Sequence, residues 1–174
     1  IKKNTGIEIY KATEKEIKKK IEELKIDYDK KAGKWKLLDV LWKYCRKKLS
    51  GPGFLINQPV EITPLAKRNS SDKRKVEQFQ VIIAGTELGN GYSELNDPLD
   101  QEERFKEQRK LKEEGDFEAQ EHDESFVEAL KYGMPPTCGF GVSERLFSYL
   151  MNLPIRECVI FPLMRPEEDK GKKN

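Results

Sequence analysis

The sequence contains few of the residues that build metal and redox centres. Three cysteines, Cys45, Cys138 and Cys158, lie far apart without a Cys-x-x-Cys pair, and His122 is the only histidine in 174 residues. Zinc fingers need four closely spaced Cys or His ligands, and a disulfide framework needs paired cysteines. The composition therefore excludes a zinc finger and argues against a disulfide framework and a Cys-His nucleophile. We expect three reduced, mostly buried thiols.

The sequence also lacks a strong charge of one sign and a long hydrophobic run. Its 33 Lys+Arg and 31 Asp+Glu give a net charge of +2, which excludes a polycationic nucleic-acid coat. Apolar runs such as 80–84 are far shorter than the ~20 residues that span a bilayer, and no basic-then-apolar leader opens the chain. We expect a cytoplasmic protein without membrane contact. Because the first residue is Ile1 and not Met, we also expect an excised or processed piece.

Hydrophobic spacing and turn residues predict helices that alternate with short strands. A capping box at Thr13–Glu16 opens a helix, and a Ser-Gly-Pro-Gly stop at 50–53 ends the next one. The predicted helices cover 11–25, 35–49, 97–115 and 123–132, with a last helix after 141, and the predicted strands cover 54–56, 78–83 and 86–94.

Ala84-Gly85 is a plausible hairpin turn between two strands. Strict alternation along the second strand places Asn90, Tyr92 and Glu94 on one face and Glu87 on the other. A carboxylate suits a cationic ligand, an aromatic ring suits an alkyl stem or an ammonium group, and glycines let a ligand approach the backbone. Spacing alone leaves two interpretations open, a ligand site or a twisted edge strand with a solvated face.

The residues of this strand also resemble a known family. The run at 85–97 reads Gly-Thr-Glu-Leu-Gly-Asn-Gly-Tyr-Ser-Glu-Leu-Asn-Asp and is similar to the lysine-binding strand of class II lysyl-tRNA synthetases. Further matches follow the order of the family at 59–67, 98–105, 134–137, 144–146 and 156–166. The resemblance implies an α+β fold with an antiparallel sheet flanked by helices. It assigns 1–166 to the C-terminal portion of the catalytic domain and leaves 167–174 as a charged, disordered tail.

The resemblance implies a role for each matching residue. Asn90, Tyr92 and Glu94 match the lysine pocket, with Glu94 facing the ε-ammonium group, Tyr92 packing on the side chain and Asn90 orienting the amino acid. Glu87 matches a carboxylate that holds Mg²⁺ on the phosphates of ATP. Its parity places it on the opposite face unless the strand twists or bulges at Gly89.

The third signature motif of the family implies the nucleotide contacts. Arg145 matches the catalytic arginine that covers the adenine ring and reaches toward the γ-phosphate, while Gly139 and Gly141 would give the backbone room beside ATP. The sequence departs from the family here, because the stretch 139–145 is one residue shorter than expected and has Ser143 near the last glycine. Gln80 replaces a second metal-binding glutamate, and a neutral amide is a poor ligand for Mg²⁺.

The implied activity is that of a lysine–tRNA ligase, which activates lysine with ATP and transfers it to tRNA(Lys), as a homodimer in its full-length form. The first and second class II motifs and the anticodon-binding domain have no counterpart here, so we expect the isolated chain to be inactive. Two alternatives stay open. One is a tRNA-independent paralogue that lysylates a translation factor, and the other is a non-catalytic lysine-binding fragment.

Overall fold

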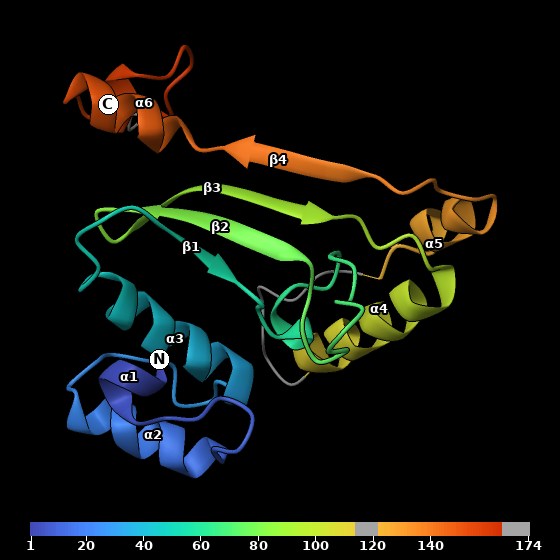
Figure 1. Ribbon diagram of the computed structural model, residues 1–174, viewed down its shortest axis with the longest axis horizontal. Helices are drawn as coiled ribbons and strands as arrows, with labels where there is room; N and C mark the ends of the chain where they lie inside the picture. Colours follow the sequence, from blue (N-terminus) through green and yellow to red (C-terminus); the bar gives the residue numbers. More distant parts are fainter. Residues whose placement is uncertain (114–121, 165–174) are drawn as a thin grey trace, which may run out of the picture. The chain divides into compact units, whose positions relative to one another are not determined.

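The computed structural model describes residues 1–113 and 122–164, in two compact units, Ile1–Gly141 and Val142–Asn174 (Figure 1). The first unit contains a helical lobe and a sheet with its own helices. The second unit contains one helix and a short 3₁₀ turn. The predicted tail at 167–174 and the predicted helix stop at Gly115 both lie outside the described residues.

The helical lobe is built on an apolar core. Its helices are α1 (Lys2–Thr5), α2 (Glu14–Glu23) and α3 (Lys34–Arg46). The predicted capping box is confirmed, since the Thr13 hydroxyl accepts from the Glu16 amide and the Glu16 carboxylate accepts from the Thr13 amide. The core residues are 0–1% exposed, namely Ile17, Ile21, Leu37, Leu38 and Leu41. The prediction was wrong for Leu49, which lies beyond α3 and is 41% exposed.

The sheet is antiparallel and has the strand order β1-β2-β3-β4 (Figure 1). Its strands are β1 (Gly53–Ile56), β2 (Gln78–Ile83), β3 (Thr86–Ser93) and β4 (Cys138–Val142). The predicted hairpin is confirmed. Ala84 and Gly85 have φ values of 48° and 70°, the pair of positive angles that a type I′ turn requires. The expected α+β fold with an antiparallel sheet is therefore confirmed.

Two helices and a polar network support the far end of β3. The helices are α4 (Pro98–Glu113) and α5 (Glu124–Lys131), preceded by the 3₁₀ turn η1 (Val60–Ile62). Arg104, which is 2% exposed, donates to both carboxylate oxygens of Asp100 at 3.0 and 2.9 Å and to the carbonyl of Ala66. Arg68 also donates to Asp100 at 3.0 Å. This network ties α4 to the segment that runs beside the end of β3, where Ala66 forms a bridge with Glu94.

The second unit contains α6 (Glu144–Met151) and the 3₁₀ turn η2 (Ile155–Glu157). The Ser143 hydroxyl caps α6 by accepting from the amide of Arg145 at 3.3 Å. No residue of α6 is buried.

Within 1–113 and 122–164, no helix combines the length and the apolar character needed to cross a membrane. The three cysteines are free thiols as expected, but the expectation that they are mostly buried was wrong, because Cys45 is buried, Cys158 is half-buried and Cys138 is exposed.

Candidate functional site

A bulge in β3 decides which side chains share a face of the sheet. Gln80 pairs with Asn90, Val81 with Gly89 and Ile82 with Glu87, so Leu88 is an extra residue on β3. Paired residues project to the same side, and an extra residue reverses the alternation beyond it. Glu87 therefore shares a face with Asn90 and Tyr92. The prediction from strict alternation, which placed Glu87 on the opposite face, was wrong. The bulge that the sequence left open as an alternative is present, at Leu88.

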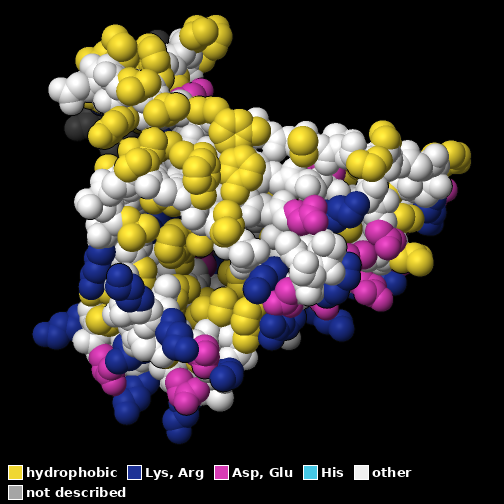
Figure 2. All heavy atoms as spheres, viewed as in Figure 1, with side chains coloured by type: hydrophobic (Ala, Val, Ile, Leu, Met, Phe, Trp, Pro, Cys, Tyr) yellow, Lys and Arg dark blue, Asp and Glu magenta, His cyan; other side chains and the backbone are white. Residues whose placement is uncertain are grey.

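The opposite face of the sheet is apolar, and its glycines have a packing role. A Cβ on Gly91 would lie 2.8 Å from the ring of Phe79, and a Cβ on Gly89 would lie 3.1 Å from the ring of Phe140. Those two rings stack with centroids 5.5 Å apart. Hydrophobic side chains gather over the sheet in Figure 2. The close packing of β3 on β4 thus accounts for glycine at these positions without a ligand.

The polar face opens into a cavity of about 550 Å³ between the sheet and the helical lobe. Four of its lining residues come from β2 and β3, namely Gln78, Gln80, Glu87 and Asn90, and Trp42 and Arg46 come from α3. The Gln78 amide donates to the Asn90 side-chain oxygen at 2.8 Å. The cavity therefore brings the predicted residues Asn90 and Glu87 together on one surface.

Several buried polar atoms of this cavity have no hydrogen-bond partner among the described residues. They are Trp42 Nε1, Arg46 Nε, Gln58 Nε2, Thr63 Oγ1, Gln78 Oε1 and Gln80 Oε1. Buried polar groups in proteins are nearly always paired with protein or water, because an unpaired group costs about 1–3 kcal/mol. This group of donors and acceptors indicates that the cavity is built to hold polar partners.

Tyr92 and Glu94 are neighbours at the far end of β3. Burial, and then the charge of Glu94, raise the pKa of Tyr92 above its usual value. The Glu94 amide donates to the carbonyl of Thr137 at 2.9 Å. A Cβ on Gly139 would lie 3.4 Å from Glu94 Oε1, so β4 passes close beside this carboxylate. The Glu94 carboxylate and the Tyr92 ring therefore lie together in one half-buried polar site.

Arg145 and the two glycines before it belong to different units. Gly139 and Gly141 lie on β4, in the first unit, where their carbonyls are within 3.2 Å of a Cβ placed on Gly91 or Gly89. They contribute to close strand packing and not to a loop. Arg145 is the second residue of α6, in the second unit, and its amide completes the cap on Ser143. The nucleotide role of all three stays a prediction.

Few side chains near Glu87 could bind a metal ion together with it. Among the residues that the structure describes, no three His, Cys, Asp or Glu side chains converge on a metal position. Gln80 lies on the same face and presents a buried oxygen that lacks a donor. Mg²⁺ in nucleotide sites is commonly held by one or two protein ligands, with the rest from phosphate and water. The Glu87 carboxylate therefore fits such an ion as its one charged ligand, with phosphate and water supplying the others, but the described residues do not fit a site formed by protein alone.

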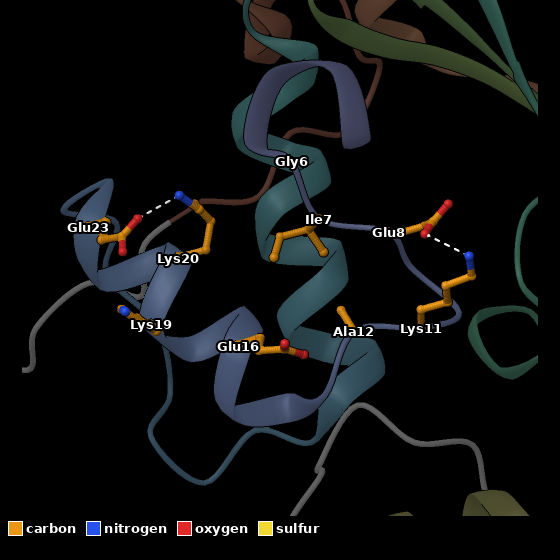
Figure 3. Close-up of a pocket in the computed structure, with 9 residues that line it drawn as sticks. All are labelled: Gly6, Ile7, Glu8, Lys11, Ala12, Glu16, Lys19, Lys20 and Glu23. Atoms are coloured by element: carbon orange, nitrogen blue, oxygen red, sulfur yellow. Dashed lines mark hydrogen bonds and ion pairs between the residues drawn. The ribbon is translucent and has the colours of Figure 1, made fainter.

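A second cavity, of about 360 Å³, lies on the surface of the helical lobe (Figure 3). Four of its six charged side chains are paired with one another. Lys20 lies 2.5 Å from Glu23 and Lys11 lies 3.3 Å from Glu8, while Glu16 accepts the capping hydrogen bonds from Thr13. We assign no ligand to this cavity.

Sequence reasoning missed two residues of the larger cavity. Gln78 alternates with Phe79 on β2 in the same way as Gln80, so a period-two polar pattern was available to find it. Arg46 carries no comparable signal, since it lies in a run of basic residues at the end of a helix. Its place beside Glu87, at 3.6 Å, depends on how α3 packs against the hairpin.

The fold agrees with the comparisons with known proteins. The model of the family "tRNA synthetases class II (D, K and N)" matches residues 3–165. The chain therefore belongs to the class II tRNA synthetases of the D, K and N group. The resemblance stated from the sequence motifs is confirmed.

The most similar relatives found include three proteins named Lysine–tRNA ligase. The chain is 46% identical over 168 residues to that of Thermosipho africanus, covering 95% of the chain and 33% of the relative. It is 43% identical over 170 residues to that of Thermotoga maritima, covering 97% and 34%. It is 42% identical over 171 residues to that of Porphyromonas gingivalis strain W83, covering 97% and 30%. The chain thus spans about a third of the length of these curated relatives.

Proposed function

We propose that this chain is part of a lysine–tRNA ligase and contributes its lysine pocket. The observation that carries the proposal is the polar face of β3, on which the bulge at Leu88 places Glu87 with Asn90 and Tyr92. The identity of 42–46% to relatives named Lysine–tRNA ligase supports lysine over other amino acids. Binding of tRNA(Lys), a homodimer and a cytoplasmic location belong to the same proposal for the full-length enzyme.

The side chains on this face suit an amino acid with a cationic end. Glu94 offers a negative charge to the ε-ammonium group of lysine, and Tyr92 offers an aromatic ring beside it. Asn90 offers an amide to orient the amino acid, and its oxygen is held by Gln78 at 2.8 Å. A half-buried carboxylate binds a cation more strongly than a fully solvated one, because water screens it less. A neutral amino acid would leave the Glu94 carboxylate unpaired, so the pocket should discriminate against neutral amino acids.

The activation step is an in-line displacement. The lysine carboxylate attacks the α-phosphate of ATP, the new C–O–P bond forms, and pyrophosphate leaves. Such a reaction needs mainly positioning and electrostatic stabilisation of the phosphate oxygens. Mg²⁺, held by Glu87, would neutralise charge on the polyphosphate. We propose Arg145 as the arginine that contacts the adenine ring and γ-phosphate, with Gly139 and Gly141 beside the nucleotide.

ATP–pyrophosphate exchange tests this proposal, with each of the standard amino acids supplied in turn to the folded 174-residue chain. We expect lysine binding without exchange, because the chain lacks counterparts of the first two class II motifs. Adding the region that precedes this segment in the relatives should restore exchange with lysine alone. Exchange with a different amino acid in that longer protein would contradict the proposal.

The same assay separates the two alternatives. A paralogue that lysylates a translation factor would exchange pyrophosphate with lysine in its complete form but would not charge tRNA. A non-catalytic lysine-binding fragment would bind lysine, lose that binding in Glu94→Gln, and show no exchange in any length.

A further inference from the structure

Arg46 is the charged residue of the large cavity whose pairing is least complete. The other two cations that line it are held by nearby carboxylates, with Lys43 Nζ 2.7 Å from Asp39 and Lys2 Nζ 2.9 Å from Glu8. Arg46 Nη1 lies 3.6 Å from Glu87 Oε2, which is too long for a hydrogen bond. Its Nε is buried and has no partner within the described part of the chain. The Nε–H of Arg46 is therefore a buried donor without a partner among the described residues.

The backbone of Arg46 is held in place by the turn between β2 and β3. Gly85 has a φ of 70°, and a Cβ there would lie 2.8 Å from the Arg46 carbonyl oxygen and 2.9 Å from Lys47 Cα. The end of α3 therefore packs directly on the backbone of the hairpin turn, as Figure 1 also shows. This contact leaves no space for even a methyl group. The backbone from which the Arg46 side chain extends is therefore held in a fixed position.

The surroundings of Arg46 favour an anion that is also a metal ligand. Its side chain is 20% exposed, and that of Glu87 is 31% exposed. A guanidinium group binds phosphate with parallel N–H donors, while a carboxylate repels phosphate unless a cation lies between them. Glu87 with a divalent cation and Arg46 with its free Nε would thus hold the same polyphosphate from two sides. Gln80, which is neutral, adds no repulsion to this arrangement.

We propose that Arg46 is an anion-binding residue that donates hydrogen bonds to the phosphate oxygens of a nucleoside polyphosphate, or of the pyrophosphate released from it. This inference rests on the proposed function, and it assigns a role to a residue on α3 that lies outside the matched motifs. Its alternative is a purely structural role, in which Arg46 interacts with the negative end of α3 and braces the hairpin.

The test is calorimetric titration of the 174-residue chain with inorganic pyrophosphate in the presence of Mg²⁺, with Mg²⁺ alone, and with lysine. Arg46→Met keeps the apolar stem and removes the charge, and Arg46→Lys keeps the charge and removes Nε. Lys47→Met is the matched control, because it removes the neighbouring, exposed cation, which does not line the cavity. Circular dichroism confirms that each variant is folded.

We expect Arg46→Met to weaken pyrophosphate binding at least about tenfold, as for a lost charge-assisted hydrogen bond. Arg46→Lys should recover part of that loss, and Lys47→Met should bind as the unmodified chain does. Lysine affinity should not change in any of the three. Mg²⁺ alone should bind Arg46→Met at least as tightly, because the variant removes a cation beside Glu87.

Three results would overturn the proposal. The first is unchanged pyrophosphate affinity in Arg46→Met, and the second is an equal loss in Lys47→Met. The third is a parallel loss of pyrophosphate and lysine binding in both Arg46 variants, which would show a structural role. Failure of the lysine-site proposal is distinguishable from all of these, because it removes lysine binding in the unmodified chain while pyrophosphate binding persists.

Discussion

The pairing of buried charges and polar groups differs between two regions of the first unit, an ion-pair network beside α4 and the cavity under the sheet. Beside α4, Arg104 donates to Asp100 and to the carbonyl of Ala66, so its charge and its donors are matched. In the cavity under β2 and β3, Gln58 and Gln78 are 6% and 7% exposed, yet each has a side-chain atom without a partner in the described structure. Arg104, Gln58 and Gln78 are all buried.

The difference separates what holds the fold from what binds a ligand. A paired buried charge contributes to stability only as a unit, and removing one member exposes the cost of the other. An unpaired buried amide lowers stability and persists where a ligand supplies the missing partner. We therefore expect substitutions beside α4 to alter stability strongly, and substitutions in the cavity to alter mainly binding.

The largest effect is expected for Asp100→Ala. This change leaves Arg104 buried, with 3% of its side chain exposed, without its carboxylate. We expect a loss of about 3–5 kcal/mol in the free energy of unfolding, as for a broken buried ion pair. Urea denaturation followed by circular dichroism measures it. Glu102→Ala, which breaks the exposed pair with Lys106 on the same helix, is the control and should cost less than about 1 kcal/mol. Equal losses would break the comparison.

A medium effect is expected for Gly85→Ala. The new Cβ would meet the Arg46 carbonyl at 2.8 Å, and φ at this position is 70°. A left-handed conformation alone costs a residue with a Cβ about 1–2 kcal/mol, so we expect a total loss of at least about 2 kcal/mol by the same denaturation assay. Gly51→Ala, where no atom lies within 4 Å of the added Cβ, should be near neutral. A similar cost at both positions would show that the contact with α3 is unimportant.

A smaller effect is expected on acidification. Burial opposes ionisation of Asp100, but hydrogen bonds from Arg104 and Arg68 outweigh it and lower its pKa. Because the pKa is lower in the folded state, the stabilisation is complete above the unfolded pKa of about 3.9 and is lost as the pH falls through the folded pKa. When the pH is lowered from 6, the free energy of unfolding should decrease once the pH is below about 4. Asp100→Asn should lack this part of the decline, and an identical decline in the variant would exclude Asp100 as its source.

The smallest effect on stability is expected for Gln58→Leu. The change removes a buried donor, Nε2, that has no partner in the described residues. We expect the free energy of unfolding to change by less than about 1 kcal/mol, or to rise. Gln101→Leu is the contrast, because Gln101 is 1% exposed and its Nε2 donates to the Pro64 carbonyl at 3.2 Å, although its Oε1 has no partner in the described residues. A larger loss at Gln58 than at Gln101 would contradict the distinction between the two regions.

The local elements of this fold were readable from the sequence. Thr13 and Glu16 predicted the start of α2, and Ala84-Gly85 predicted the hairpin, because caps and turns depend on residues close in the chain. The helix boundaries differed by a few residues, since fraying at helix ends depends on tertiary contacts. The helix predicted for 35–49 ends at Arg46, so Leu49 lies past the end of α3.

The composition of the polar face was predictable only in part. Asn90 and Tyr92 follow the alternation of an ideal strand, whereas Glu87 changes face because Leu88 is an extra residue. A bulge depends on the register with the partner strand, which is a long-range property. Arg46 reaches the same cavity from a helix 41 positions before Glu87 in sequence, so no local pattern relates the two residues.

The central claim is that the polar face of β3 forms a lysine pocket with Glu94 as its charge partner. Isothermal titration of lysine into the chain and into Glu94→Gln tests it most directly, with Glu103→Gln on the exposed side of α4 as control. We expect the unmodified chain and the control to bind lysine equally. Glu94→Gln should bind at least about tenfold more weakly, as for a lost charge-assisted contact. Equal lysine affinity in Glu94→Gln and the unmodified chain would contradict the account.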